Sequence, residues 1–153
     1  MISESISDLS DISRSMSSEI ILNNGLIKAL DFEVVQLNKS GLYKIDLTVS
    51  GEPVFMDSKN ELLLFRIIQE AINNIIKHAS AKCILINLNY AEAFLCLNIN
   101  DDGKGFICTK NSASGTGIAN MKRRADLMQG HLAINSLPGN GTIIEIKIPL
   151  YEK

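Results

Sequence analysis

A stripe of polar side chains suited to metal and phosphate chemistry lies along one predicted helix, residues 58–79. Glu70, Asn74 and His78 recur at intervals of four, and Lys77 stands beside His78. Because positions four apart share a helix face, the stripe combines a carboxylate, an amide oxygen, a cation and an imidazole. Mg²⁺ takes one or two protein oxygens together with water and substrate phosphates, so the neutral amide of Asn74 suits it.

The alternative reading of this stripe is an ordinary solvated helix face. The adjacent pair Asn73 and Asn74 speaks against it, since each Asn costs about 0.5 kcal/mol in a helix interior relative to good helix formers. A solvated face would more often carry Glu, Lys or Gln. The composition of the stripe favours a function, and the alternative stays open.

A second candidate site follows a predicted strand and reads Asp101-Asp102-Gly103-Lys104-Gly105-Phe106. A carboxylate at a strand end can accept a hydrogen bond from the exocyclic amine of adenine. Guanine presents an oxygen at that edge, so an acceptor at Asp101 would reject it if the position is buried. Gly103 and Gly105 let the backbone pass close to a flat base. A tight turn explains this motif equally well when it is taken alone.

Two further glycine-rich segments are weak signals by themselves. Gly115-Thr116-Gly117 opens a predicted helix, where free amides can cradle an anion. The segment is a poor dinucleotide fingerprint because it follows a loop and carries Asn120 at the third glycine position. Hairpin geometry accounts for Gly139-Asn140-Gly141. Thr142 remains a candidate for a second contact to the adenine edge.

The hydrophobic pattern predicts the elements that position these residues. Helices are expected at 2–16, 19–38, 58–79 and 116–129, and strands at 42–49, 82–90, 93–100, 131–137 and 142–150. The short joint between the second and third strands predicts an antiparallel hairpin. Together they indicate an α/β fold, a two-layer sandwich whose mixed sheet is covered by helices on one face.

The composition excludes several classes of protein. The chain has 153 residues, 46% of them hydrophobic, a formal net charge of −2 and no Trp, which argues against nucleic-acid binding. Cys83, Cys96 and Cys108 lie far apart, so we expect neither zinc nor disulfides and favour a reduced, cytoplasmic compartment. Neither a signal peptide nor a membrane-spanning run is visible, so no membrane contact is expected from this part of the protein.

The order of the four motifs resembles one known superfamily. Glu70-x-x-x-Asn74-x-x-Lys77-His78, Asp101-x-Gly103-x-Gly105, Gly115-x-Gly117-x-x-x-Met121 and Gly141-Thr142 are similar to the N, G1 and G2 boxes and the closing Gly-Thr of the GHKL ATPases (gyrase, Hsp90, histidine kinases and MutL). The likeness covers about Leu26 to Leu150 and implies the Bergerat ATP-binding fold. Residues 66–79 and 115–125 resemble the sensor histidine kinases that include nitrate sensors and the thermosensor of Gram-positive bacteria.

The resemblance implies a role for each matching residue. Asn74 would hold Mg²⁺, Asp101 would read the adenine of ATP, and Glu70 would orient or activate the phosphoryl acceptor. The remaining positions would form the ATP pocket, its lid or its phosphate contacts: Lys77, His78, Gly103, Gly105, Gly115, Thr116, Gly117, Ile118, Met121, Arg123 and Thr142. Glu70, Asn74 and Lys77 are thus the expected catalytic residues.

The resemblance also implies a function and a division of the chain. A sensor histidine kinase of this kind transfers the γ-phosphoryl group of ATP to a His on a dimerisation domain, for relay to a response regulator. Residues 1–18 resemble the tail of the dimerisation helix, 19–40 a linker helix and 41–153 the ATP-binding domain. His78 and His131 sit in the wrong elements to be the acceptor, so we expect a fragment of a homodimeric kinase, or an enzyme acting on a separate protein.

Two alternatives remain at this point. A serine kinase of the anti-sigma-factor type has the same ATP site, although a remnant of a dimerisation helix speaks against it. A non-catalytic module that binds ATP and only changes shape would need the same motifs.

Overall fold

The computed structural model describes residues 18–54, 56–107 and 116–150 of the chain. Its elements are α2 (Leu26–Asn38), β1 (Lys44–Gly51), α3 (Ser58–Asn74), the π-helical turn η1 (Ile75–Ala79), β2 (Cys83–Tyr90), β3 (Phe94–Asp101), α4 (Thr116–Leu127), β4 (His131–Ser136) and β5 (Thr142–Pro149). The expected order of helices and strands is confirmed over these residues. The helix predicted over residues 2–16 lies outside the described residues. So do Cys108 and Gly115.

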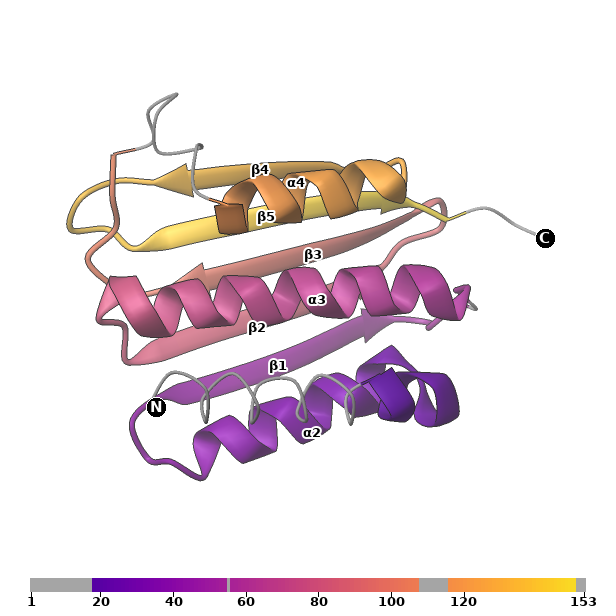
Figure 1. Ribbon diagram of the computed structural model, residues 1–153, viewed down its shortest axis with the longest axis horizontal. Coiled ribbons are helices and arrows are strands. Elements are labelled where there is room, and N and C mark those ends of the chain that lie inside the picture. Colours follow the sequence, from indigo (N-terminus) through magenta and orange to yellow (C-terminus); the bar gives the residue numbers. More distant parts are fainter. Residues whose placement is uncertain (1–17, 55, 108–115, 151–153) are drawn as a thin grey trace, which may run out of the picture.

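The five strands form one mixed sheet in the order β1-β2-β3-β5-β4. Strand β1 runs parallel to β2, and the other neighbouring pairs are antiparallel, including the predicted β2–β3 hairpin. Figure 1 shows α2, α3 and α4 lying side by side over one face of the sheet. The predicted two-layer sandwich is therefore confirmed.

The core lies between this sheet face and the helices. Alternate residues of the central strands point inward, as Ile84, Ile86 and Leu88 do in β2, because side chains in a strand alternate between the two faces. The apolar stripe of α3 meets them and includes Leu64 and Ile68, which are fully buried. Each such side chain stabilises the fold by about 1.5–3 kcal/mol, which fixes the rotation of α3 and turns its polar stripe away from the sheet.

The helix expected over residues 19–38 is broken at Gly25. Residues 18–24 are helical, Gly25 has φ 86°, and α2 begins at the next residue. A positive φ is accessible to glycine at little cost, so the chain can turn there. Leu26 and Leu30 of α2 are buried in the same core as the sheet.

The last turn of the helix expected over residues 58–79 is a π-helix rather than an α-helix. Ser80 ends η1 in the left-handed conformation with φ 51°. The carbonyl of Ala79 accepts a hydrogen bond from the backbone N–H of Lys104 at 2.8 Å. The helix end is thereby tied to the segment that leaves β3. No helix among the described residues is long and apolar enough to cross a bilayer.

Candidate functional site

A cavity of about 670 Å³ lies between α3–η1, the start of α4 and the inward face of β3, β4 and β5. Most of the predicted site residues line it: Glu70, Asn74, Lys77, His78, Asp101, Gly105, Thr116, Gly117, Ile118, Met121 and Thr142. Four motifs separated by up to 72 positions in the sequence therefore meet in one place. Gly103 does not line the cavity but lies beside Oδ1 of Asp101 and the carbonyl of Ala79.

The alternation of β3 carries Asp101 to the cavity. Leu95, Leu97 and Ile99 face the core, and Asp101 is the next residue of that face, where the strand ends. Its register partner on β5 is Thr142, which is also buried. A carboxyl and a hydroxyl thus stand next to each other at the end of the core.

The two oxygens of Asp101 have different environments. Oδ1 accepts a hydrogen bond from the backbone N–H of Gly103 at 2.8 Å. Oδ2 is buried and has no hydrogen-bond partner within the described chain. A buried polar atom without a partner costs about 1–3 kcal/mol, so this oxygen is a strong candidate for contact with a ligand.

Burial raises the pKa of the Asp101 carboxyl; the backbone N–H groups of Gly103 and Thr142 counteract the shift and the charge of Asp102 adds to it. Because the folded pKa lies above the unfolded one, the folded state holds the proton more tightly. This contribution to stability is complete below the unfolded pKa and is lost as the pH rises through the raised value. Ionising Asp101 in the folded protein therefore opposes stability.

The neighbouring carboxylate, Asp102, serves the fold instead. Its Oδ1 accepts hydrogen bonds from the backbone N–H groups of Lys82 at 2.8 Å and Cys83 at 2.9 Å. These bonds lower its pKa, the one to Cys83 most. Asp102 is exposed and ties the end of β3 to the start of β2, so the two adjacent acids differ in environment and in role.

The glycines around Asp101 allow backbones to approach closely. A Cβ on Gly103 would collide with the carbonyl oxygen of Ala79, and one on Gly141 would collide with that of Asp101. Gly105 has φ 64° and would meet the carbonyl of Leu137 in the β4–β5 turn. The segment after β3 bends at Gly103 and shapes this wall of the cavity.

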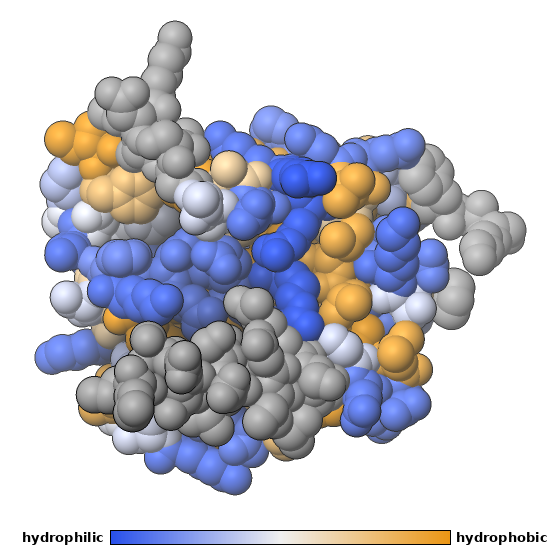
Figure 2. Space-filling model, in the orientation of Figure 1, coloured by the Kyte–Doolittle hydropathy of each residue, from blue (hydrophilic) through white to orange (hydrophobic). Residues whose placement is uncertain are grey.

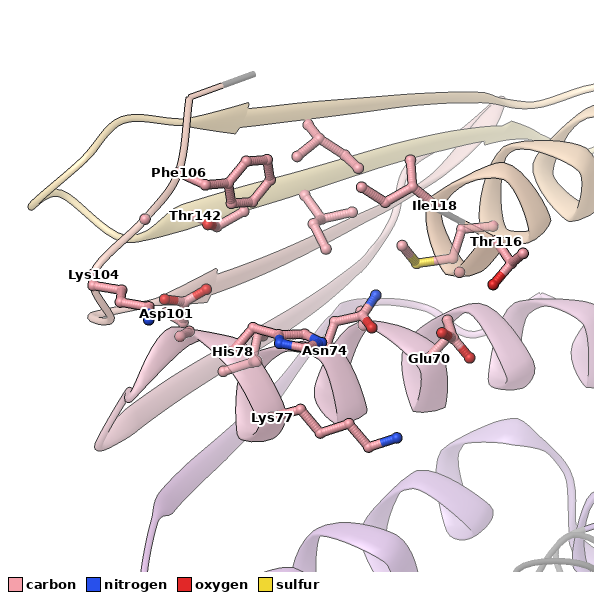
Figure 3. A pocket seen from close by; sticks show the side chains of 18 residues that line it. Glu70, Asn74, Lys77, His78, Asp101, Lys104, Phe106, Thr116, Ile118 and Thr142 are labelled. Carbon is pink, nitrogen blue, oxygen red and sulfur yellow. The ribbon is translucent and has the colours of Figure 1, made fainter. Parts of the chain in front are cut away.

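The other end of the cavity is built by α3 and the first turn of α4. A Cβ added to Gly117 would collide with Oε1 of Glu70 and lie 3.3 Å from Nδ2 of Asn74. The absence of a side chain at Gly117 therefore lets α4 begin against these two polar groups. Figure 3 shows Asp101 and Thr142 at one end, Glu70 beside Thr116 at the other, and Asn74 between them.

The predicted cations lie at the rim of the cavity. Lys77 and His78 are exposed, and the ammonium of Lys77 extends below α3 while Asp101 and Thr142 lie above it (Figure 3). Seen from the helix face, hydrophilic residues gather over the C-terminal half of α3 (Figure 2). Arg123 is exposed and lines neither this cavity nor a smaller one of about 150 Å³, which Arg124 lines together with Glu70.

Sequence reasoning missed several residues at the base of the site. Lys104 and Phe106 line the cavity from within the glycine motif that follows β3, and Ile134 and Ile144 line it from β4 and β5. The alternation of inward and outward side chains along β4 and β5 could have predicted that the two isoleucines face the cavity. These apolar side chains make the inner part of the cavity suitable for a flat ring.

The site offers few metal ligands of its own. No cluster of three or more His, Cys, Asp or Glu side chains suited to a metal occurs among the described residues. The amide of Asn74 and the carboxylate of Glu70 are nevertheless close together at Gly117. One or two protein oxygens are enough for Mg²⁺, because this ion takes its other ligands from phosphates and water. They are too few for a metal that is held by protein side chains alone.

Comparisons with known proteins agree with this geometry. The family model described as histidine kinase-, DNA gyrase B-, and HSP90-like ATPase matches residues 59–152. DegS of Brevibacillus brevis, a signal transduction histidine-protein kinase/phosphatase, is 29% identical over 150 residues, covering 98% of this chain and 39% of that protein. The sensor histidine kinase ComP of Bacillus subtilis strain 168 is 31% identical over 153 residues, covering 96% of this chain and 20% of that protein.

The fold has solved counterparts as well. The structure of the Acinetobacter baumannii histidine kinase AdeS matches with a TM-score of 0.69 at 18% identity, over 96% of this chain and 81% of that one. The chain spans well under half the length of the two curated relatives described above. Since the family model matches more than half of the chain and includes the whole cavity, the chain belongs to the histidine kinase-, DNA gyrase B- and HSP90-like ATPase family.

Proposed function

We propose that this domain binds Mg-ATP and transfers its γ-phosphoryl group to a His on a dimerisation domain, from which it passes to a response regulator. The observation that carries the proposal is a single cavity joining a partnerless buried carboxylate oxygen, on Asp101, to the polar stripe of α3. The parts of ATP match this cavity in order. Its flat base carries an amine that suits the carboxylate end, and its anionic phosphates, beyond the sugar, suit the polar stripe.

The base belongs at the Asp101 end. Oδ2 of Asp101 accepts one N–H of the adenine amine, which gives the buried oxygen its missing partner. Ile134 and Ile144 supply apolar contacts to the ring. A 6-oxo base would place an oxygen against Oδ2, so the same position rejects it.

The phosphates belong at the end formed by Asn74, Glu70 and the first turn of α4. The amides that open α4 attract anions, and Lys77 and His78 lie at the rim to neutralise charge. Asn74 supplies the protein oxygen for Mg²⁺, which offsets phosphate charge when it is bound. Phosphoryl transfer asks the protein mainly for positioning and charge stabilisation, and these residues provide both.

Glu70 lies where the acceptor must approach. Its carboxylate stands at the start of α4, at the opposite end of the cavity from Asp101 (Figure 3). There it orients the imidazole of the incoming His and accepts its ring proton. The chain itself supplies no nucleophile to the cavity in this scheme.

The remaining assignments rest on the relatives. DegS and ComP are histidine kinases by name, which supports a histidine acceptor over a serine acceptor. We assign residues 1–18 to the end of a dimerisation helix, 19–40 to a linker and 41–153 to the ATP-binding domain. As part of the same proposal, the full protein is a homodimer whose kinase domain lies in the cytoplasm. Its partner is a response regulator.

Replacing Asp101 with Asn should severely weaken ADP binding. The variant keeps the size of the side chain but puts an N–H₂ group or a weaker acceptor opposite the adenine amine, so affinity should fall about 100-fold, or ~2.7 kcal/mol. Calorimetric titration and the thermal shift with ADP measure this. Asp102→Asn is the matched control and should bind normally, since Asp102 is exposed. A wild-type thermal shift for Asp101→Asn would refute the assignment.

Replacing Asn74 with Ala should weaken the Mg²⁺-dependent part of ADP binding about tenfold, because the metal loses its protein oxygen. The experiment titrates ADP with Mg²⁺ and again with a chelator. Asn73→Ala is the control, since Asn73 is exposed and lines only the smaller cavity. Equal losses for Asn74→Ala in both titrations would remove Asn74 from the metal site.

Replacing Glu70 with Gln should separate chemistry from binding. With labelled ATP and a dimerisation domain that carries the acceptor His, the wild-type chain should form acid-labile, base-stable phosphohistidine. Glu70→Gln should slow this transfer about 100-fold while ADP affinity changes little, because a general base contributes 10²–10⁴ in rate. Acid-stable phosphoserine, or binding with no transfer by the wild-type chain, would contradict the histidine kinase proposal.

A further inference from the structure

A row of three polar residues crosses the ends of three neighbouring strands. Ser136 of β4 is the register partner of Thr142 of β5, and Thr142 is the register partner of Asp101 of β3. Their exposed fractions are 8%, 7% and 4%, and they are the buried polar residues of the described part of the chain. Asp101 and Thr142 line the cavity, whereas Ser136 lies behind them and has no role in the proposed function.

The hydroxyl of Ser136 has three hydrogen-bonding neighbours. Its oxygen lies 2.9 Å from the backbone nitrogen of Phe106, 3.0 Å from the carbonyl oxygen of Gly141 and 2.7 Å from Oγ1 of Thr142. These contacts join the segment after β3, the β4–β5 turn and the cavity wall. Every partner of this single hydroxyl therefore belongs to the wall around the base end.

The positions of the hydrogens follow from counting donors. The N–H of Phe106 can only donate, and the carbonyl of Gly141 can only accept. Ser136 has one hydrogen, which must point to Gly141, and two lone pairs, one of which faces Phe106. Its second lone pair can then be used only if Thr142 donates. In this arrangement alone, all three contacts are hydrogen bonds.

Thr142 is consequently left with no hydrogen for the cavity. Its oxygen can accept there but cannot donate, and the partnerless Oδ2 of an ionised Asp101 beside it can also only accept. Two adjacent acceptors match an amino group, which carries two N–H donors, and repel a carbonyl oxygen. A free threonine hydroxyl would rotate and serve either group.

We propose that Ser136 is a positioning residue that fixes Thr142 as a hydrogen-bond acceptor, so that the Asp101–Thr142 pair selects a 6-amino purine nucleotide over a 6-oxo purine nucleotide. The inference rests on the proposed binding of adenine at Asp101. It adds a specificity determinant that does not touch the nucleotide and acts through the direction of one O–H bond.

The test compares the affinities of ADP and inosine diphosphate (IDP) for this chain, each with Mg²⁺, by calorimetry. The wild type should prefer ADP. In Ser136→Ala the Thr142 hydrogen is released and can donate to the 6-oxo group, so the ADP/IDP affinity ratio should fall about tenfold. The ratio is informative even if the loss of the Phe106 and Gly141 contacts weakens the binding of both nucleotides.

Variants of Thr142 test the same hydroxyl while leaving Ser136 in place. Thr142→Ser keeps an O–H group and should keep the wild-type ratio within about twofold. Thr142→Val removes the acceptor and should lower the ratio, and adding Ser136→Ala to it should cause no further change, because Ser136 acts through Thr142. This double-mutant comparison separates positioning from general support of the fold.

An unchanged ADP/IDP affinity ratio in Ser136→Ala would overturn the inference. If Ser136→Ala does not fold, an unchanged ratio in Thr142→Val would overturn it instead. Neither result would count against the proposed binding of ADP. Additive effects of the two substitutions on the ratio would also overturn the inference. Failure of the wild-type chain to bind ADP at all would instead remove the proposed function, and this inference with it. The failures are thus distinguishable.

Discussion

The site depends on one buried carboxylate that is only half satisfied. Asp101 ends the inward face of β3, and the N–H of Gly103 holds one of its oxygens while the other has no partner within the described chain. Burying a polar oxygen without a hydrogen-bond partner opposes folding, because the oxygen loses its contact with water. The same loss of solvation raises the pKa of the Asp101 carboxyl. The large apolar core offsets that cost, and a ligand with an N–H donor removes it.

The close approach of backbones around Asp101 makes this arrangement possible. Gly103 lets the segment after β3 lie against the end of η1, and Gly141 lets the β4–β5 turn lie against the carbonyl of Asp101. Side chains at either position would push the walls apart. The walls of the base end therefore meet closely only because these two positions carry no side chain.

Helix α3, continued by η1, joins this end to the end of the cavity at the start of α4. Its apolar stripe is buried against the sheet, so Glu70 and Asn74 are carried along the cavity about 6 Å apart, for a rise of 1.5 Å per residue. The π-helical turn η1 continues this row to His78. The hydrogen bond from the backbone N–H of Lys104 to the carbonyl of Ala79 fastens the helix end to the segment that follows β3. Under the proposed function, recognition of the base would therefore set the position of the phosphates relative to Glu70.

The sequence was sufficient for the elements and for most of the cavity, because strand alternation and helical spacing are local properties. Periodicity placed the polar stripe of α3 opposite its buried face, and the order of the glycine motifs indicated the family. The break at Gly25 and the π-helical turn at Ile75–Ala79 escaped prediction, since they depend on packing and on Ser80 and Lys104. Ser136 escaped as well, because its importance comes from its register with β5 rather than from its neighbours in the chain.

A crystal structure of this chain with Mg-ADP tests the central claim most directly. It should show the adenine amine within hydrogen-bonding distance of Oδ2 of Asp101, with the phosphates directed toward Asn74 and the start of α4. A nucleotide bound outside the cavity, or with its base turned so that Oδ2 of Asp101 still lacks a partner, would contradict the account.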